Sequence, residues 1–241
     1  MIGQTPVTFR TATTALEVGG APRVVGTLST LAPKGALAGD VIEVRLDKIA
    51  ERADWLKRCV ALQSKGKPVL LTVRLCAEGG DWKKDGEERL EIYQQGLKEL
   101  AGVDVELGSA ISSDVAREAA RLKKASVISF HDFEKTPPLR KLCAIIEQQH
   151  ALGSIAKVST MIKHGSDVDV LRALLRRPWP KPVCVIGMGG AWSKTRIEFA
   201  TLGSCLAYGY LDKPTAPGQM SAAELVRRLS RACNASTNMQ A

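Results

Sequence analysis

Apolar residues gather in eight short runs rich in β-branched side chains, and longer stretches with the periodicity of helices separate these runs. Each run is apolar on both of its alternating faces, which is typical of strands buried on both sides of a parallel sheet. The pattern therefore predicts eight strands, over residues 23–28, 41–47, 69–75, 103–107, 126–131, 155–159, 183–188 and 204–210.

Several stretches between the runs begin or end with residues that favour helix termini. Segments 85–88 and 221–224 have the spacing of capping boxes, and Thr136 precedes two prolines as a candidate N-cap. Pro178 would end a helix over residues 166–177.

The alternation of strands and helices in a chain of 241 residues predicts an α/β fold, a (β/α)8 TIM barrel that forms a single domain over residues 1–241. An open sheet that binds a dinucleotide would carry a glycine-rich turn after its first strand, and residues 28–32 contain no glycine. Residues 1–22 read as an N-terminal β-hairpin that caps the bottom of the barrel, and residues 234–241 as a frayed tail.

Composition narrows the class of protein. The formal net charge is +9, but the basic residues are spread along amphipathic helices and only 5% of residues are aromatic. A solvated helix surface explains this charge better than nucleic-acid binding, which uses aromatic rings as stacking platforms. No apolar run reaches the length of a membrane span and the N-terminus lacks a secretory pattern, so we expect a soluble cytoplasmic protein.

The six cysteines are scattered through apolar segments and form no CxxC pair. This distribution indicates free buried thiols rather than disulfides or a zinc site. We therefore expect no metal centre.

In a barrel of this kind the active site lies at the C-terminal ends of the strands, so charged residues at those ends are candidates. Glu43, Arg45 and Asp47 alternate along the second predicted strand and so face the same way. An ion-pair cluster at the barrel mouth and a set of ligand-binding groups explain them equally well. Arg74 ends the third strand, and Glu78 follows it beside two glycines.

The fifth and sixth strands carry the candidates for acid, base and nucleophile. His131 ends the fifth strand, where barrels keep such groups, whereas we expect His150 and His164 at the surface. Lys157 stands among apolar residues of the sixth strand. Burial favours the neutral amine of Lys157, which is the form that condenses with a ketone to a Schiff base. Alternatively, Lys157 is a salt-bridge partner.

Two loops follow the last predicted strands. The glycines within 187–190 either cradle a phosphate or allow a tight turn, and Arg196 beyond them is suited to clamp a carboxylate. Segment 212–219 is rich in proline and glycine and carries hydroxyl and amide groups, which suits a lid over a substrate as well as an ordinary solvent turn.

Taken together, these motifs resemble type I 3-dehydroquinate dehydratase. They occur in order from about residue 23 to residue 233, at the ends of the predicted strands. The matching segments are Glu43-Val44-Arg45-Leu46-Asp47, Arg74 with Glu78-Gly79-Gly80, Ser129-Phe130-His131-Asp132-Phe133, Lys157, Met188 with Arg196, and Pro214-Thr215-Ala216-Pro217-Gly218-Gln219.

The resemblance implies a cofactor-free lyase of the shikimate pathway, which leads to chorismate and the aromatic amino acids. Such an enzyme removes water from 3-dehydroquinate by syn elimination through an imine. The resemblance implies that Lys157 forms the Schiff base, that His131 is the general acid and base, and that Glu78 orients the imidazole. It also implies a homodimer, and from the composition we expect no nucleic-acid or membrane partner.

The remaining site residues are implied in the same way. Arg196 would hold the substrate carboxylate, and Phe133 and Met188 would pack against the ring. The groups expected to bind the hydroxyls and the carboxylate are Glu43, Arg45, Arg74, Thr215 and Gln219.

The sequence departs from the family pattern at residues 158–159 and 194–195, without the loss of a catalytic group. Two other functions are alternatives. A class I aldolase would share Lys157, but it typically needs a phosphate site, and the loop after the eighth predicted strand has no second basic residue in a glycine-rich cradle. A nucleic-acid-binding barrel would use the net charge and would not need Lys157.

Overall fold

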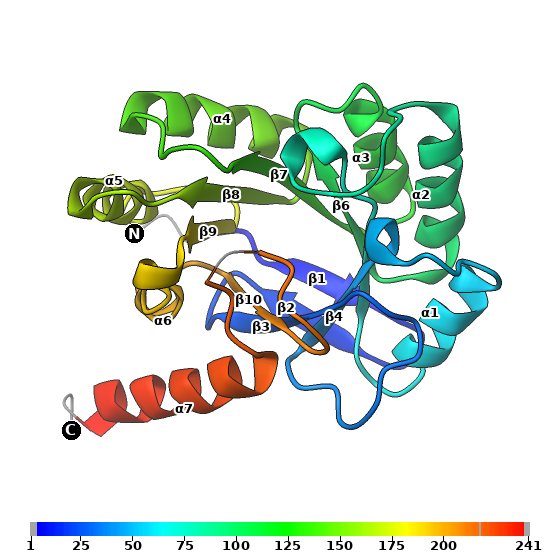
Figure 1. Ribbon diagram of the computed structural model, residues 1–241, viewed down its shortest axis with the longest axis horizontal. Coiled ribbons are helices and arrows are strands. Elements are labelled where there is room, and N and C mark those ends of the chain that lie inside the picture. Colours follow the sequence, from blue (N-terminus) through cyan, green and yellow to red (C-terminus); the bar gives the residue numbers. More distant parts are fainter. Residues whose placement is uncertain (1–3, 217, 239–241) are drawn as a thin grey trace.

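The computed structural model describes residues 4–216 and 218–238, with side chains as far as residue 232. Eight parallel strands form a nearly closed barrel in the order β10-β3-β4-β5-β6-β7-β8-β9, and helices surround it (Figure 1). β9 and β10 meet at the remaining gap, where the Cys205 N–H donates to the Val183 carbonyl at 2.9 Å. The predicted (β/α)8 barrel is therefore confirmed.

The barrel strands lie within three residues of the predicted boundaries. They are β3 (Arg23–Leu28), β4 (Val41–Arg45), β5 (Val69–Thr72), β6 (Gly102–Glu106), β7 (Ala125–Asp132), β8 (Ile155–Met161), β9 (Val183–Met188) and β10 (Leu206–Tyr210).

Most of the connections are helical. The α-helices are α1 (Trp55–Gln63), α2 (Glu87–Glu99), α3 (Ser112–Arg121), α4 (Leu139–Leu152), α5 (Gly165–Leu175), α6 (Thr195–Thr201) and α7 (Ala222–Asn238). Short 3-10 turns follow three strands, η1 (Leu46–Lys48), η2 (Cys76–Glu78) and η3 (Gly190–Trp192). Helix α7 continues into the segment predicted to be frayed, and residues 239–241 lie outside the description.

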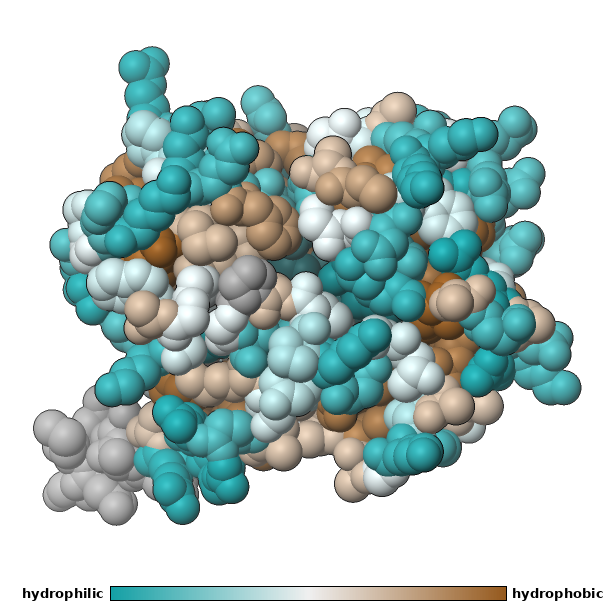
Figure 2. Space-filling model, in the orientation of Figure 1, coloured by the Kyte–Doolittle hydropathy of each residue, from teal (hydrophilic) through white to brown (hydrophobic). Residues whose placement is uncertain are grey.

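The apolar side chains lie between the strands and the surrounding helices and inside the lower barrel. Hydrophilic side chains cover much of the face of the molecule shown in Figure 2. Within the described ranges, no helix combines the length and the apolar character that crossing a membrane requires.

The predicted N-terminal hairpin is present as β1 (Val7–Arg10) and β2 (Ala15–Val18), a separate antiparallel pair. Phe9 of β1 is fully buried and belongs to the same apolar cluster as Val41 and Ala125, the first residues of β4 and β7. Residues at strand starts mark the N-terminal end of a parallel barrel, so the hairpin covers the bottom, opposite the strand ends that carry the candidate chemistry.

Two of the expected helix caps are wrong. Asp85 does not cap α2, because its carboxylate accepts from Arg89 and from the Ala110 N–H of the next connection. Thr136 does not cap α4, and its hydroxyl instead donates to the Met161 carbonyl at the end of β8. The capping interaction at Ser221 is found, since its hydroxyl accepts from the Glu224 N–H.

Two predictions of exposure are also wrong. His150, expected at the surface, is 7% exposed, because the last turn of α4 presses it edge-on against Trp179 and beside the Pro182 carbonyl. Cys76, expected to be buried, is exposed on η2. His164 is exposed as predicted, and Cys233 lies beyond the described side chains.

A buried arginine joins α2 to the ends of β5 and β6. Arg89 is fully buried, and its guanidinium forms an ion pair with Glu106, donates to the Val73 carbonyl and reaches Asp85. A charge without contact with water needs such partners, because an unpaired buried ion is strongly destabilising.

Arg89→Met is expected to lower the free energy of unfolding by about 3–5 kcal/mol, because Glu106 then loses a buried counter-ion. Denaturant unfolding of the purified protein measures this loss. Arg121→Met is the matched control, since the pair of Arg121 with Glu118 lies at the surface and its removal should change stability little. A loss for Arg89→Met no larger than that of the control would contradict the assignment.

Candidate active site

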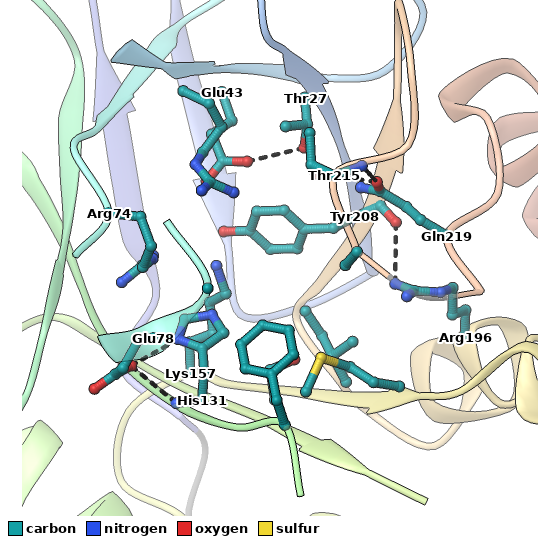
Figure 3. Close-up of a pocket in the computed structure, with 17 residues that line it drawn as sticks. Thr27, Glu43, Arg74, Glu78, His131, Lys157, Arg196, Tyr208, Thr215 and Gln219 are labelled. Carbon is teal, nitrogen blue, oxygen red and sulfur yellow. Dashed lines mark hydrogen bonds and ion pairs between the residues drawn. The ribbon is translucent and has the colours of Figure 1, made fainter. Parts of the chain in front are cut away.

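A pocket opens at the C-terminal end of the barrel, and every predicted site residue lines it. Figure 3 shows the polar side chains converging from several strands and loops. The predicted residues in this pocket are Glu43, Arg45, Arg74, Glu78, His131, Phe133, Lys157, Met188, Arg196, Thr215 and Gln219. Their roles remain predictions, but their meeting in one place is a property of the fold.

Lys157 projects from β8 into the pocket with 4% of its surface exposed. Its Nζ atom lies 2.8 Å from Oδ2 of Asp104 and 4.1 Å from the centre of the Tyr208 ring. The strand is buried on both faces, and β8 pairs along its length with β7 and β9. The amine is therefore held in a defined position by a carboxylate and an aromatic face.

Asp104 is the shared partner of two cations. It is fully buried on β6, and its Oδ1 atom accepts from Arg74 at 2.6 Å and from the Ser129 hydroxyl at 2.7 Å. Burial by itself would raise the pKa of Asp104, but the charges of Arg74 and Lys157 lower it below its ordinary range. The carboxylate is thus ionised and balances positive charge beneath the pocket.

Both terminal nitrogens of the Arg74 guanidinium contact groups within the protein. Besides Asp104, it donates to Ser129 at 2.6 Å and lies 3.3 Å from Glu106. Glu106 also accepts from the Leu75 N–H at 2.8 Å, which ties down the chain just after Arg74. Arg74 therefore contributes charge to the pocket while its donors serve mainly to connect β5, β6 and β7.

His131 and Glu78 form a hydrogen-bonded pair beside this network, because β7 lies between β6 and β8. One carboxylate oxygen of Glu78 lies 2.8 Å from His131 Nδ1 and accepts from the His131 N–H at 3.0 Å. Burial raises the pKa of Glu78 to about 7. Burial, followed by the charges of Arg74 and Lys157, lowers the pKa of His131 well below its ordinary value, so the imidazole is neutral and can accept a proton.

Local backbone geometry brings Glu78 to this position. Gly79 ends η2 with φ of +79°, and a Cβ atom there would lie 2.3 Å from the Phe133 ring. Only glycine accommodates both the left-handed backbone and this close approach. Phe133 in turn stacks on His131, with ring centres 6.3 Å apart, so the Glu78-Gly79 turn and the end of β7 position the imidazole together.

The ion-pair interpretation of the charged second strand is confirmed for two of its three residues. Arg45 forms a two-point ion pair with Asp47, which lies beyond the strand on η1. Glu43 faces the pocket and accepts from the hydroxyls of Thr27 at 2.8 Å and Thr72 at 2.9 Å. The mouth therefore holds a structural ion pair beside a carboxylate that retains capacity for a ligand.

Arg196 and the loop after β10 close one side of the pocket. Arg196 donates to the carbonyls of Gly218 and Tyr208, and its Nη2 atom is buried without a partner among the described residues. Burial lowers the pKa of Arg196 to about 10. Thr215 and Gln219 hydrogen-bond to each other in the same loop, and Pro217 lies outside the described residues.

Sequence reasoning missed Asp104, Glu106 and Tyr208. The first two stand at alternate positions at the end of β6, so the rule that singled out Glu43 and Arg45 would have found them. Tyr208 lies inside an apolar strand, where nothing in the pattern separates it from core aromatics. In the described part of the chain, no group of three or more His, Cys, Asp or Glu residues is placed to hold a metal ion.

The fold is similar to those of solved dehydroquinate dehydratases. The structure from Geobacillus kaustophilus gives a TM-score of 0.83 at 24% identity, covering 97% of this chain and 98% of that one. The type I enzyme from Clostridium difficile, solved with covalently modified comenic acid, gives 0.82 at 22% identity, covering 96% and 99%. These likenesses show the fold alone.

Sequence comparisons identify the family. The 3-dehydroquinate dehydratase of Methanocaldococcus jannaschii is 34% identical over 186 residues, which is 75% of this chain and 82% of that protein. The one from Methanocella arvoryzae is 29% identical over 194 residues, 80% of this chain and 88% of the relative. The model of type I 3-dehydroquinase matches residues 23–232, and the chain therefore belongs to the type I 3-dehydroquinase family.

Proposed function

We propose that this protein dehydrates 3-dehydroquinate to 3-dehydroshikimate through an imine on Lys157. The observation that carries the proposal is a buried lysine, paired with Asp104, in the same pocket as the His131–Glu78 pair. The family and its curated relatives supply the substrate. The proton to be removed lies beside a ketone and is a poor acid, so the reaction needs an electron sink, which a lysine imine provides.

Asp104 supports each charged state of the lysine nitrogen. In the resting protein it pairs with the ammonium group. Once the amine has lost its proton, its nitrogen attacks the ketone carbon, water leaves, and a protonated imine forms on the same nitrogen. The carboxylate then stabilises that positive charge in a buried setting, where electrostatic interactions are strong.

His131 is proposed to move both protons of the elimination. Its neutral imidazole takes a proton from the CH2 group beside the imine carbon, which gives an enamine. It then returns the proton to the hydroxyl on the next carbon, and this hydroxyl leaves as water. One imidazole acting on one face of the ring explains a syn elimination. Hydrolysis of the product imine restores Lys157.

Glu78 is proposed to orient His131 and to stabilise the imidazolium. Both the Nδ1 atom and the backbone N–H of His131 face one Glu78 oxygen, which fixes the ring and leaves Nε2 for the substrate. When the imidazole accepts a proton, an ionised Glu78 compensates the new charge.

The remaining polar groups are proposed to bind the substrate. The unpartnered Nη2 atom of Arg196 suits the carboxylate, and Thr215 and Gln219 close over it from the loop after β10. Phe133 and Met188 supply apolar contact with the ring. The predicted hydroxyl- and carboxylate-binding groups of the opposite rim are Glu43, Arg45 and Arg74.

Membership of the family also supports a proposal for the pathway, the cellular location and the oligomeric state of the protein. We infer that it acts in the cytoplasm, in the shikimate pathway, as a homodimer without nucleic-acid or membrane partners. Light scattering on the purified protein measures the assembly directly.

Borohydride reduction in the presence of 3-dehydroquinate is expected to attach the ligand to Lys157, because reduction converts an imine to a stable amine. Peptide mapping by mass spectrometry locates the adduct. Lys163→Ala, at an exposed position just beyond β8, is the control and should keep both adduct and turnover. Turnover retained by Lys157→Ala, with no adduct in the unaltered protein, would refute the imine.

His131→Ala is expected to form the imine but to lower kcat by roughly 10²- to 10⁴-fold, the usual contribution of a positioned acid–base group. Single-turnover kinetics with borohydride trapping separate imine formation from elimination. His164→Ala, which alters an exposed histidine, should behave as the unaltered protein does. Near-normal turnover by His131→Ala would show that another group moves the protons.

The rate should fall as pH drops below about 7, because Glu78 then gains a proton and no longer balances the imidazolium. The pH profile of kcat/KM measures this acidic limb. Glu78→Gln should be slower at every pH and should lack the limb, whereas the exposed Glu134→Gln should keep it. An unchanged limb in Glu78→Gln would assign it to a different group.

A further inference from the structure

The Tyr208 hydroxyl is an unsatisfied donor in the pocket. The residue is 5% exposed, and its Oη atom is buried without a hydrogen-bond partner among the described residues. Buried polar groups are almost always paired, so an orphan that faces a binding pocket points to an atom of the ligand. The mechanism proposed above does not use this hydroxyl.

The neighbours of Tyr208 restrict what that atom can be. Its ring lies over Lys157, and Figure 3 shows the hydroxyl pointing between Glu43 on one side and Arg74 on the other. Burial, with added effects from Asp104 and Glu43, raises the pKa of Tyr208 well above its ordinary value, so the hydroxyl remains a donor at neutral pH.

Glu43 offers the complementary acceptor. Its two oxygens already accept one hydrogen bond each, from Thr27 and Thr72, and a carboxylate can accept about four. A donor from Tyr208 and an acceptor on Glu43 match a hydroxyl, which can accept from one group and donate to the other. A carbonyl oxygen could satisfy only the tyrosine, and a CH2 group could satisfy neither.

We infer that Tyr208 is a specificity-determining residue that donates to the substrate hydroxyl on the carbon next to the ketone, while that hydroxyl donates to Glu43. This inference rests on the proposed imine at Lys157, which sets the ketone carbon beside the Tyr208 ring. 3-Dehydroquinate has a hydroxyl there, on the side of the ketone away from the CH2 group that loses its proton. A ligand ring without that hydroxyl would leave the Tyr208 hydroxyl buried and unpaired, and this weakens the binding of such a ligand.

The test compares Tyr208→Phe with the unaltered protein on two substrates, 3-dehydroquinate and its analogue that lacks the hydroxyl next to the ketone. Tyr208→Phe should lower kcat/KM for 3-dehydroquinate about 10-fold, the effect of one lost hydrogen bond to a buried donor. On the analogue it should have no such effect, so discrimination between the two substrates falls about 10-fold. Tyr210→Phe, on the same strand but outside the pocket, should leave both values unchanged.

Other results overturn the inference. Equal kcat/KM for Tyr208→Phe and the unaltered protein, with loss only in Tyr208→Leu, would mean that the ring matters and the hydroxyl does not. Equal losses of kcat/KM on both substrates would mean that the Tyr208 hydroxyl serves the reaction but does not recognise the substrate hydroxyl next to the ketone. A borohydride adduct on Lys157 in the unaltered protein shows that the proposed function stands whichever result is found, whereas its absence refutes that function separately.

Discussion

The site depends on one buried carboxylate shared between two cations. Asp104 has no contact with water, so its charge is tolerable only because Arg74 and Lys157 both pair with it. These three residues come from one side of the barrel: Asp104 lies on β6, Arg74 follows β5, and Lys157 lies on β8, which β7 separates from β6. The network thereby fixes the position of the Lys157 amine along the barrel axis. Rigid strands position a reactive group more reproducibly than loops do.

The same network divides the pocket into regions of different charge. Arg74 and Lys157 lie close enough to His131 to disfavour its protonated form, while Glu78 holds the ring from the far side. Burial, together with these positive charges, thus keeps the imidazole neutral, and we propose that the Glu78 carboxylate supports it once it becomes charged. We propose that this small inward set is the basicity that meets the substrate, because most of the other basic residues lie at the surface, on helices and on loops.

Sequence patterns predicted what depends on short-range periodicity and missed what depends on long-range contacts. The strands and the candidates at their ends were predictable, because burial on both faces and interruption by charge are visible along the chain. Asp85 has the spacing of a cap, yet its carboxylate serves Arg89 and a backbone N–H 25 residues away. His150 looks like a surface residue on α4 until the fold places Trp179 against it.

The glycines and the free arginine nitrogen of the pocket favour a carboxylate ligand over a phosphate. Gly189 and Gly218 face each other so closely that a Cβ on Gly218 would lie 2.6 Å from the Gly189 carbonyl, so these glycines serve contact between two loops rather than a phosphate cradle. Arg196 offers one unpartnered nitrogen, and Tyr208 offers a donor near the acceptor Glu43. A hydroxyl of either ligand could bind between Tyr208 and Glu43, so this pair does not decide the question. A single free guanidinium nitrogen without a glycine cradle suits a carboxylate better than a phosphate, and this argues against the aldolase alternative on grounds independent of Lys157, which both enzymes would share.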